Sequence, residues 1–130
     1  MSFDIFVCRF QNGESAPLDM SAAREVLAPY VVARDLGENF LQVRTAENEE
    51  AGVYFSSPDN ITFNRFGGGG IMDLLAALLR RLDAVLIVPG GPTVIRRDED
   101  HDLLPAALRD EWPVVVARTG AEIDRAIRAS

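Results

Sequence analysis

The stretch ITFNRFGGGGIMDLLAALLRRLDAVLIV, residues 61–88, decides how the chain folds. Residues 61–66 read as a strand, and four glycines follow. Residues 71–82 repeat large apolar side chains at the spacing of one helix face, and 84–88 form a short apolar run of the kind found in buried strands. The stretch therefore predicts a strand, a glycine loop, a helix with one broad apolar face and a second strand.

The residues before this stretch predict a strand, a helix and two more strands. Residues 3–10 are apolar on both faces, which is typical of an interior strand. The helix starts at Asp19 or Ser21, and Pro29 kinks or ends it near Ala28. Its expected apolar face is Val26, Leu27, Tyr30 and Val31. Strands at 40–45 and 53–56 then join 61–66 through polar turns, an arrangement that suits an antiparallel meander.

The residues after it predict a hairpin, a short helix, a strand and a final helix. The hairpin pairs 84–88 with 93–97 around Pro-Gly-Gly-Pro, and the short helix lies near 103–109. A strand at 114–118 leads to a helix that Thr119 and Glu122 open as a capping box. The expected class is α+β, in the order βαβββαββαβα. We expect a single domain over 1–130, with a mixed, mainly antiparallel sheet and helices mainly on one face.

Composition excludes several functions. The formal net charge is −7 and the pI is near 4.6, which disfavours binding to nucleic acid phosphates. All 13 basic residues are arginine, so a Walker A loop and a Schiff-base mechanism are both excluded. The single cysteine, Cys8, allows no internal disulfide and favours the cytoplasm. We expect no signal peptide, because the N-terminus has no basic region followed by a long apolar core. We expect no membrane span, because charges interrupt the apolar stretch 71–88.

The glycine run is the candidate ligand site. A strand, a glycine loop and a helix can hold an anion on free backbone amides and the helix dipole. The residues Arg65-x-x-Gly68-x-Gly70 resemble the R/Q-x-x-G-x-G/A signature of the GNAT acyltransferase superfamily, and the Leu-rich helix that follows is similar too. The resemblance implies that Gly67, Gly68, Gly69 and Gly70 lie near the pyrophosphate of acetyl-CoA and that Arg65 faces it. A flexible joint between strand and helix is the competing interpretation.

The other candidates for chemistry do not combine into a site. The acidic run Asp98–Asp102 could start a calcium loop, which needs glycine at its sixth position and glutamate at its twelfth. In this sequence those positions are Leu103 and Arg109. We interpret the run as a solvated turn that favours the N-terminus of the next helix. His101 is the only histidine, too few for a zinc site, and Cys8 lies on an apolar strand face as an inert thiol. We therefore predict no catalytic residues, no metal and no cofactor.

Trp112, at the entrance of the last strand, is the candidate partner-binding residue, because tryptophan is enriched at interface hot spots. The chain as a whole resembles a family of short bacterial α+β proteins to which no activity is assigned. The matching segments are SFDIFVCRF, ITFNRFGGGGIMDLLAALLRRLDAVLIV and LLPAALRD. This resemblance implies a compact cytoplasmic domain and nothing about mechanism.

Three functions remain open from the sequence. The first is a non-enzymatic module, of inhibitor or immunity type, that binds a basic protein partner through its acidic surface. The second is binding of acyl-CoA or another phosphate-containing small molecule at Gly67–Gly70. The most specific version of this hypothesis is a GNAT-like acyltransferase. The third is a structural domain that self-associates, for example as a homodimer through a strand edge.

Overall fold

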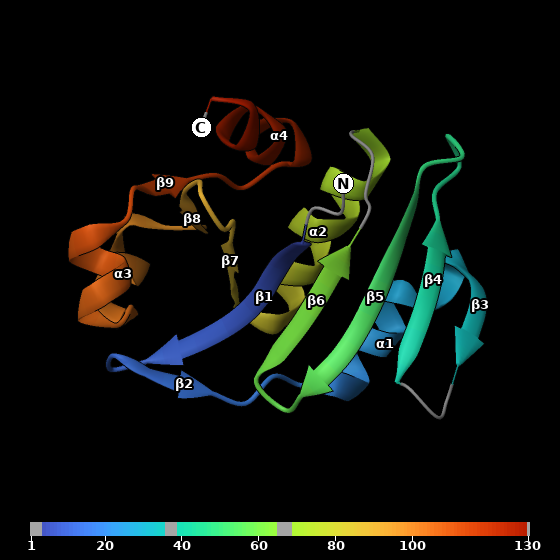
Figure 1. Cartoon of the computed structure of the whole chain (residues 1–130), viewed down its shortest axis with the longest axis horizontal. Helices are drawn as coiled ribbons and strands as arrows, with labels where there is room; N and C mark the ends of the chain where they lie inside the picture. The colour runs from blue at the N-terminus through green and yellow to red at the C-terminus, as the bar shows by residue number, and fades with distance from the viewer. Residues whose placement is uncertain (1–3, 36–38, 65–68, 130) are drawn as a thin grey trace.

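The computed structural model describes residues 4–35, 39–64 and 69–129. The strands are β1 (Asp4–Gln11), β2 (Glu14–Ala16), β3 (Val31–Asp35), β4 (Phe40–Arg44), β5 (Glu50–Ser57), β6 (Asn60–Asn64), β7 (Val85–Ile87), β8 (Thr93–Ile95) and β9 (Val114–Val116). The helices are α1 (Met20–Leu27), α2 (Gly69–Leu82), α3 (Ala106–Glu111) and α4 (Gly120–Arg128), with the 3-10 helices η1 (Ala28–Tyr30) and η2 (Asp98–Leu103). The predicted α+β class is confirmed (Figure 1).

The strands of the described residues form one open, mixed sheet in the order β3-β4-β5-β6-β1-β7-β8-β9, with β2 paired to the end of β1. β1 is central because it pairs with β6 on one side and β7 on the other. The pairs from β3 to β8 are antiparallel, whereas β9 runs parallel to β8 after η2 and α3 have carried the chain back. β3 and β9 are therefore the two edges of the sheet.

The main core lies between one face of this sheet and the helices α1, α2 and α4. Ile5 and Val7 of β1 are fully buried, and so are Ile61 and Phe63 of β6. The predicted stripe of α2 is buried against them: Ile71, Leu74, Leu75, Leu78, Leu79 and Leu82. α1 and α2 lie behind the sheet in Figure 1, and both α1 and α4 pack on α2. Helix packing mainly on one face is thus confirmed.

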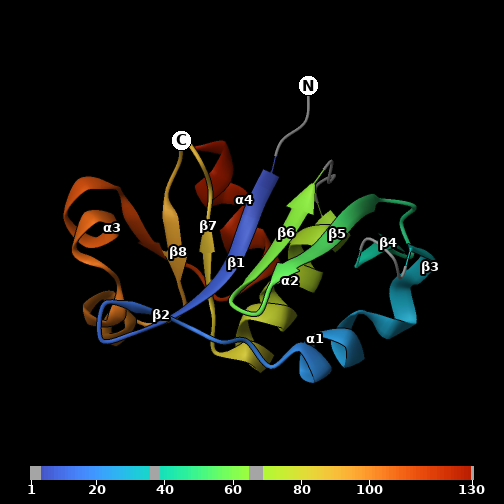
Figure 2. The same ribbon diagram turned by 60° about the horizontal axis from the view of Figure 1, so that its bottom comes forward.

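α3 belongs to a smaller core on the opposite face, at the β8 end of the sheet. Val85, Ile95 and Leu104 are its buried centre, and Phe10 and Leu108 pack against it. Figure 2 shows α3 at this end of the sheet, far from α1. The alternation of strand side chains explains the division, because Leu86 and Val94 point instead into the main core.

Two strands are missing from the predicted order. β2 is three residues long and mostly exposed, so it has no apolar alternation to detect. The residues of β3 are also largely exposed, so this strand has no apolar alternation either. The expectation that Tyr30 and Val31 lie on the face of the first helix is wrong: α1 ends at Leu27, Tyr30 is in η1 and Val31 opens β3. Pro29 is responsible, because its ring cannot continue an α-helix.

The helix expected near 103–109 is also displaced. Pro105 separates η2 from α3 and serves as the N-cap of α3, so the α-helix begins only at Ala106. The acidic run forms η2 and is not wholly solvated. Asp100 is buried and pairs with Arg97 at 3.0 Å. Within the described ranges, no helix is both long and apolar enough to cross a bilayer.

The N-terminus of α4 lies directly against α2 at Asp73. The capping box at Thr119 and Glu122 is confirmed, and Gly120, which lies between these two residues, is buried. A Cβ added at Gly120 would lie 2.6 Å from the backbone nitrogen of Asp73. The two helices can approach this closely only because residue 120 has no side chain.

We therefore expect Gly120→Ala to lower the free energy of unfolding by about 2 kcal/mol, since the new methyl group meets backbone that cannot move easily. Gly52→Ala is the matched control. Its Cβ would meet the Phe40 ring at 3.0 Å, and that side chain can rotate away. Urea unfolding of both variants measures the difference. Equal losses would show that the close approach of α4 to α2 is not a constraint.

Candidate functional site

The glycine run lies at the start of α2. Arg65, Gly67 and Gly68 fall outside the described residues. Gly69 and Gly70 already belong to the helix, which therefore begins two residues before the expected position. The N–H of Gly70 donates a hydrogen bond of 2.5 Å to Oε1 of Glu49, from the turn between β4 and β5. A carboxylate of the protein itself thus meets the positive end of α2.

The same turn explains why residue 70 is glycine. An added Cβ would lie 2.9 Å from both Glu49 Oε1 and the Cβ of Thr45. Thr45 is buried, and its hydroxyl accepts a 3.3 Å hydrogen bond from the N–H of Glu49, which holds the turn in place. Ligand binding at the glycine run stays a prediction. A phosphate would have to displace the Glu49 carboxylate from Gly70.

The other reactive groups are placed as follows. Burial, and to a lesser extent the negative charge of Asp59, raises the pKa of the Cys8 thiol to about 11. Cys8 is therefore a neutral thiol at physiological pH. His101 is in η2, and its Nδ1 lies 3.7 Å from Oδ1 of Asp102. No group of three or more His, Cys, Asp or Glu side chains in the described part of the chain could hold a metal ion.

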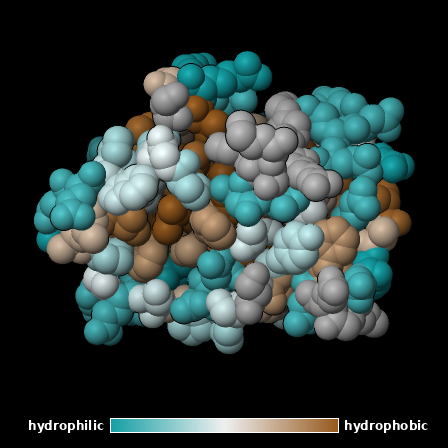
Figure 3. Space-filling view, in the orientation of Figure 1, coloured by the Kyte–Doolittle hydropathy of each residue, from teal (hydrophilic) through white to brown (hydrophobic). Residues whose placement is uncertain are grey.

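Trp112 directly follows α3 and leads into β9. Its backbone is extended, with φ −120° and ψ 147°, because the residue before a proline is kept out of the helical region. Pro113 therefore both ends α3 and turns Trp112 away from it. The indole stays 41% exposed, and Val115 and Val116 of β9 remain 36% and 38% exposed. Figure 3 shows hydrophobic surface gathered near this end of the sheet, between α3 and α4.

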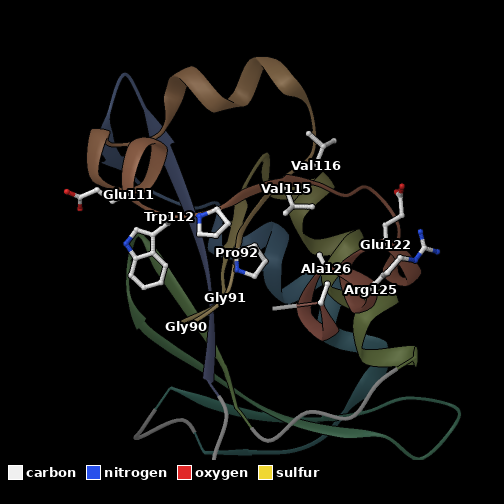
Figure 4. Close-up of a pocket in the computed structure, with 12 residues that line it drawn as sticks. Gly90, Gly91, Pro92, Glu111, Trp112, Val115, Val116, Glu122, Arg125 and Ala126 are labelled. Atoms are coloured by element: carbon white, nitrogen blue, oxygen red, sulfur yellow. The ribbon is translucent and has the colours of Figure 1, made fainter.

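Trp112 lines a groove of about 790 Å³ between β9 and α4, which we call the β9–α4 groove. Its lining residues are Gly90, Gly91, Pro92, Glu111, Trp112, Pro113, Val115, Val116, Glu122, Arg125, Ala126 and Ala129. Figure 4 shows Trp112 toward one end, Pro92 and Val115 in the middle, and Arg125 at the other end. The groove has the size and the mostly apolar lining of a typical binding site.

A tight turn between β7 and β8 forms one wall of the groove. Val88 O accepts a 2.9 Å hydrogen bond from the N–H of Gly91, and Gly90 has φ +78°. With Pro89 at its second position, this is a type II turn, which requires a residue with positive φ at the third. The predicted hairpin is confirmed, and the turn brings Gly91 and Pro92 beside Trp112.

Helix α4 forms the opposite wall and carries the charges at that end. Glu122 Oε1 accepts hydrogen bonds from the N–H groups of Arg118 and Thr119, at 3.0 and 3.2 Å. These bonds hold the pKa of the Glu122 carboxyl below its usual value of 4.5, Arg118 contributing most. The carboxylate is therefore ionised at neutral pH and supports α4 until the solution becomes acidic.

Sequence reasoning found Trp112 but not the groove beside it. The groove joins residues from the β7–β8 turn, β9 and α4, which are separate in the chain. One local signal was present: three valines follow Pro113, while the final helix offers few large apolar residues to cover them. No known protein family, curated protein or solved structure matches the chain. The two resemblances drawn from the sequence therefore stay predictions.

Removing the Glu49 carboxylate tests its role at α2. We expect Glu49→Ala to lower the free energy of unfolding by about 1 kcal/mol, the usual effect of losing a helix N-cap. Glu47→Ala, an exposed acid of the same turn, is the control and should leave stability unchanged. Chemical denaturation provides the measurement. Indistinguishable variants would mean that Glu49 does not stabilise the helix.

The raised pKa of Cys8 predicts slow thiol chemistry. At pH 8 a disulfide reagent should modify the native protein far more slowly than the urea-unfolded protein. Because the folded-state pKa is raised, the stabilising effect of a neutral thiol is complete below about pH 9 and is lost as the pH rises toward 11. Rapid modification of the folded protein at neutral pH would contradict this.

Proposed function

We propose that this protein is a non-enzymatic binding module that recognises another protein through the β9–α4 groove. The observation that carries the proposal is the half-exposed Trp112 beside a large groove with mainly apolar walls. Tryptophan is enriched among the few residues that supply most of the binding energy of an interface. Exposed apolar surface of this kind marks interaction sites more often than it marks an isolated monomer.

The charge of the chain favours a basic partner. The net charge is −7, and Glu111 and Glu122 lie at opposite ends of the groove, where Arg125 is the one basic lining residue. Opposite charge steers two proteins together and weakens as salt is added. A cytoplasmic inhibitor or immunity-type protein that covers a basic enzyme would have these properties. Two copies of this chain would repel each other, which disfavours self-association as the main function.

Panning a displayed library of random peptides on the immobilised protein tests the proposal, with Trp112→Ala as the counter-selection. We expect peptides of about micromolar affinity that lose at least about tenfold on Trp112→Ala. Tyr30→Ala is the matched control, because Tyr30 is a comparably exposed aromatic residue beside the opposite edge of the sheet. That variant should bind like the wild type.

Salt provides the second readout of the same experiment. Binding of the selected peptides should weaken as ionic strength rises, because the surface is acidic. A failure to enrich any peptide over the counter-selection would refute the module. So would peptides that bind Trp112→Ala and the wild type equally.

A further inference from the structure

The free side of β9 carries backbone groups that face away from the sheet. The N–H of Thr93 donates to Pro113 O at 2.8 Å, and the N–H of Ala117 donates to Ile95 O at 2.9 Å. Residues 113, 115 and 117 thus direct their backbone groups toward β8. Because these directions alternate along a strand, Val114 and Val116 direct theirs outward. No strand in the described residues pairs with that side of β9.

A second, smaller pocket lies on the other face of this edge. It has a volume of about 380 Å³ and is lined by Ile95, Asp98, His101, Asp102, Arg109, Trp112, Val114 and Val116. Trp112 and Val116 line both this polar pocket and the β9–α4 groove. The edge of β9 therefore runs between an apolar groove and a polar pocket.

The polar pocket is acidic. Among the described residues, no ion pair to Asp98 lies within 4.0 Å, and Asp102 has only the 3.7 Å approach of His101. Arg109, the basic lining residue, is already 3.3 Å from Asp110. With two carboxylates against one guanidinium, the lining of the polar pocket has a net negative charge.

Resting on the proposed function, we propose that the partner contributes an extended segment that adds to the sheet beside β9, with alternating apolar and basic side chains. Successive side chains of a strand point to opposite faces. One set would enter the β9–α4 groove against Val115 and Pro92, and the other would meet Asp98 and Asp102. Backbone pairing at an exposed edge, with pockets that read alternate side chains, is an established mode of peptide recognition.

Other occupants use less of this surface. A helix in the groove would leave the outward backbone groups of Val114 and Val116 without partners. A second copy of the chain would present one of its two edge strands. Its β9 contains only valine, and its β3 carries a single basic residue, Arg34, which Asp35 follows at once. Charge complementarity therefore selects a basic, extended segment of a different protein.

Short synthetic peptides test the pattern on the full-length protein by fluorescence anisotropy. The probe alternates valine and arginine, and its control has the same composition with all valines before all arginines. We expect the alternating peptide to bind at least about tenfold more tightly, because only it fits both faces at once. Equal affinity for the two peptides, or no binding of either, would overturn the proposal.

Backbone methylation of the alternating peptide tests the edge directly. In an antiparallel arrangement, each residue opposite Val114 or Val116 shares their face and exchanges backbone hydrogen bonds with them. These residues are the arginines, so N-methylation at arginine should abolish binding and N-methylation at valine should be tolerated. A parallel arrangement reverses the two results. If both methylated peptides bind like the parent, the segment does not pair with β9.

Protein variants complete the experiment. Val116→Pro removes an outward N–H while leaving the bonds to β8 in place, and Val116→Ala removes only side chain atoms. We expect at least about tenfold weaker binding for Val116→Pro and a smaller loss for Val116→Ala, with circular dichroism to confirm folding. The double variant Asp98→Asn, Asp102→Asn should bind the alternating peptide less tightly, and its binding should depend less on salt. The control variant Glu25→Gln, on α1, should change neither property.

The outcomes separate this inference from the proposed function. The library experiment could yield peptides that need Trp112 but tolerate backbone methylation at every position. That result would support the proposed binding module and overturn strand addition. Absence of any Trp112-dependent peptide would instead refute the module itself, and strand addition with it.

Discussion

The packing of α2 across β1 and β6 is the constraint on which the rest of the structure depends. Leu75, Leu78 and Leu79 of α2 are buried against sheet residues that include Val7 and Phe63. Each such side chain contributes about 1.5–3 kcal/mol when it is fully buried, so this contact outweighs the effects of single polar interactions at the surface. α1 and α4 then pack on α2. The position of α2 therefore sets which face of the sheet receives helices.

The β9–α4 groove follows from where α4 is held. The close approach of Gly120 to Asp73 places the first turn of α4 on α2, and Ile123 is buried in the main core. Farther along the helix, Ala126 and Ala129 line the groove, and these side chains are too short to cover Val115. At the other end of the groove, Pro113 ends α3, and the chain leaves the helix at Trp112 to continue as β9. β9 is thus left as an edge with open surface on both faces.

The glycine run has a structural role at its described end. Gly70 lets the turn that contains Thr45 and Glu49 rest on the N-terminus of α2, and Glu49 supplies the hydrogen bond that an external anion would otherwise supply. This contact joins the β4–β5 turn to the central helix. Glycine at the mouth of a helix therefore serves close packing here, as it does at Gly120 in α4.

The sequence alone determined the α+β class, most of the elements and the core stripe of α2. These depend on local periodicity, on proline and glycine, and on capping residues such as Thr119, all of which act within a few residues of the chain. It did not reveal β2 and β3, because exposed short strands have no apolar alternation. Only the tertiary structure decided the strand order, the pairing of Glu49 with Gly70 and the groove around Trp112. Each of these joins segments far apart in the chain, and the packing of α2 brings such segments together.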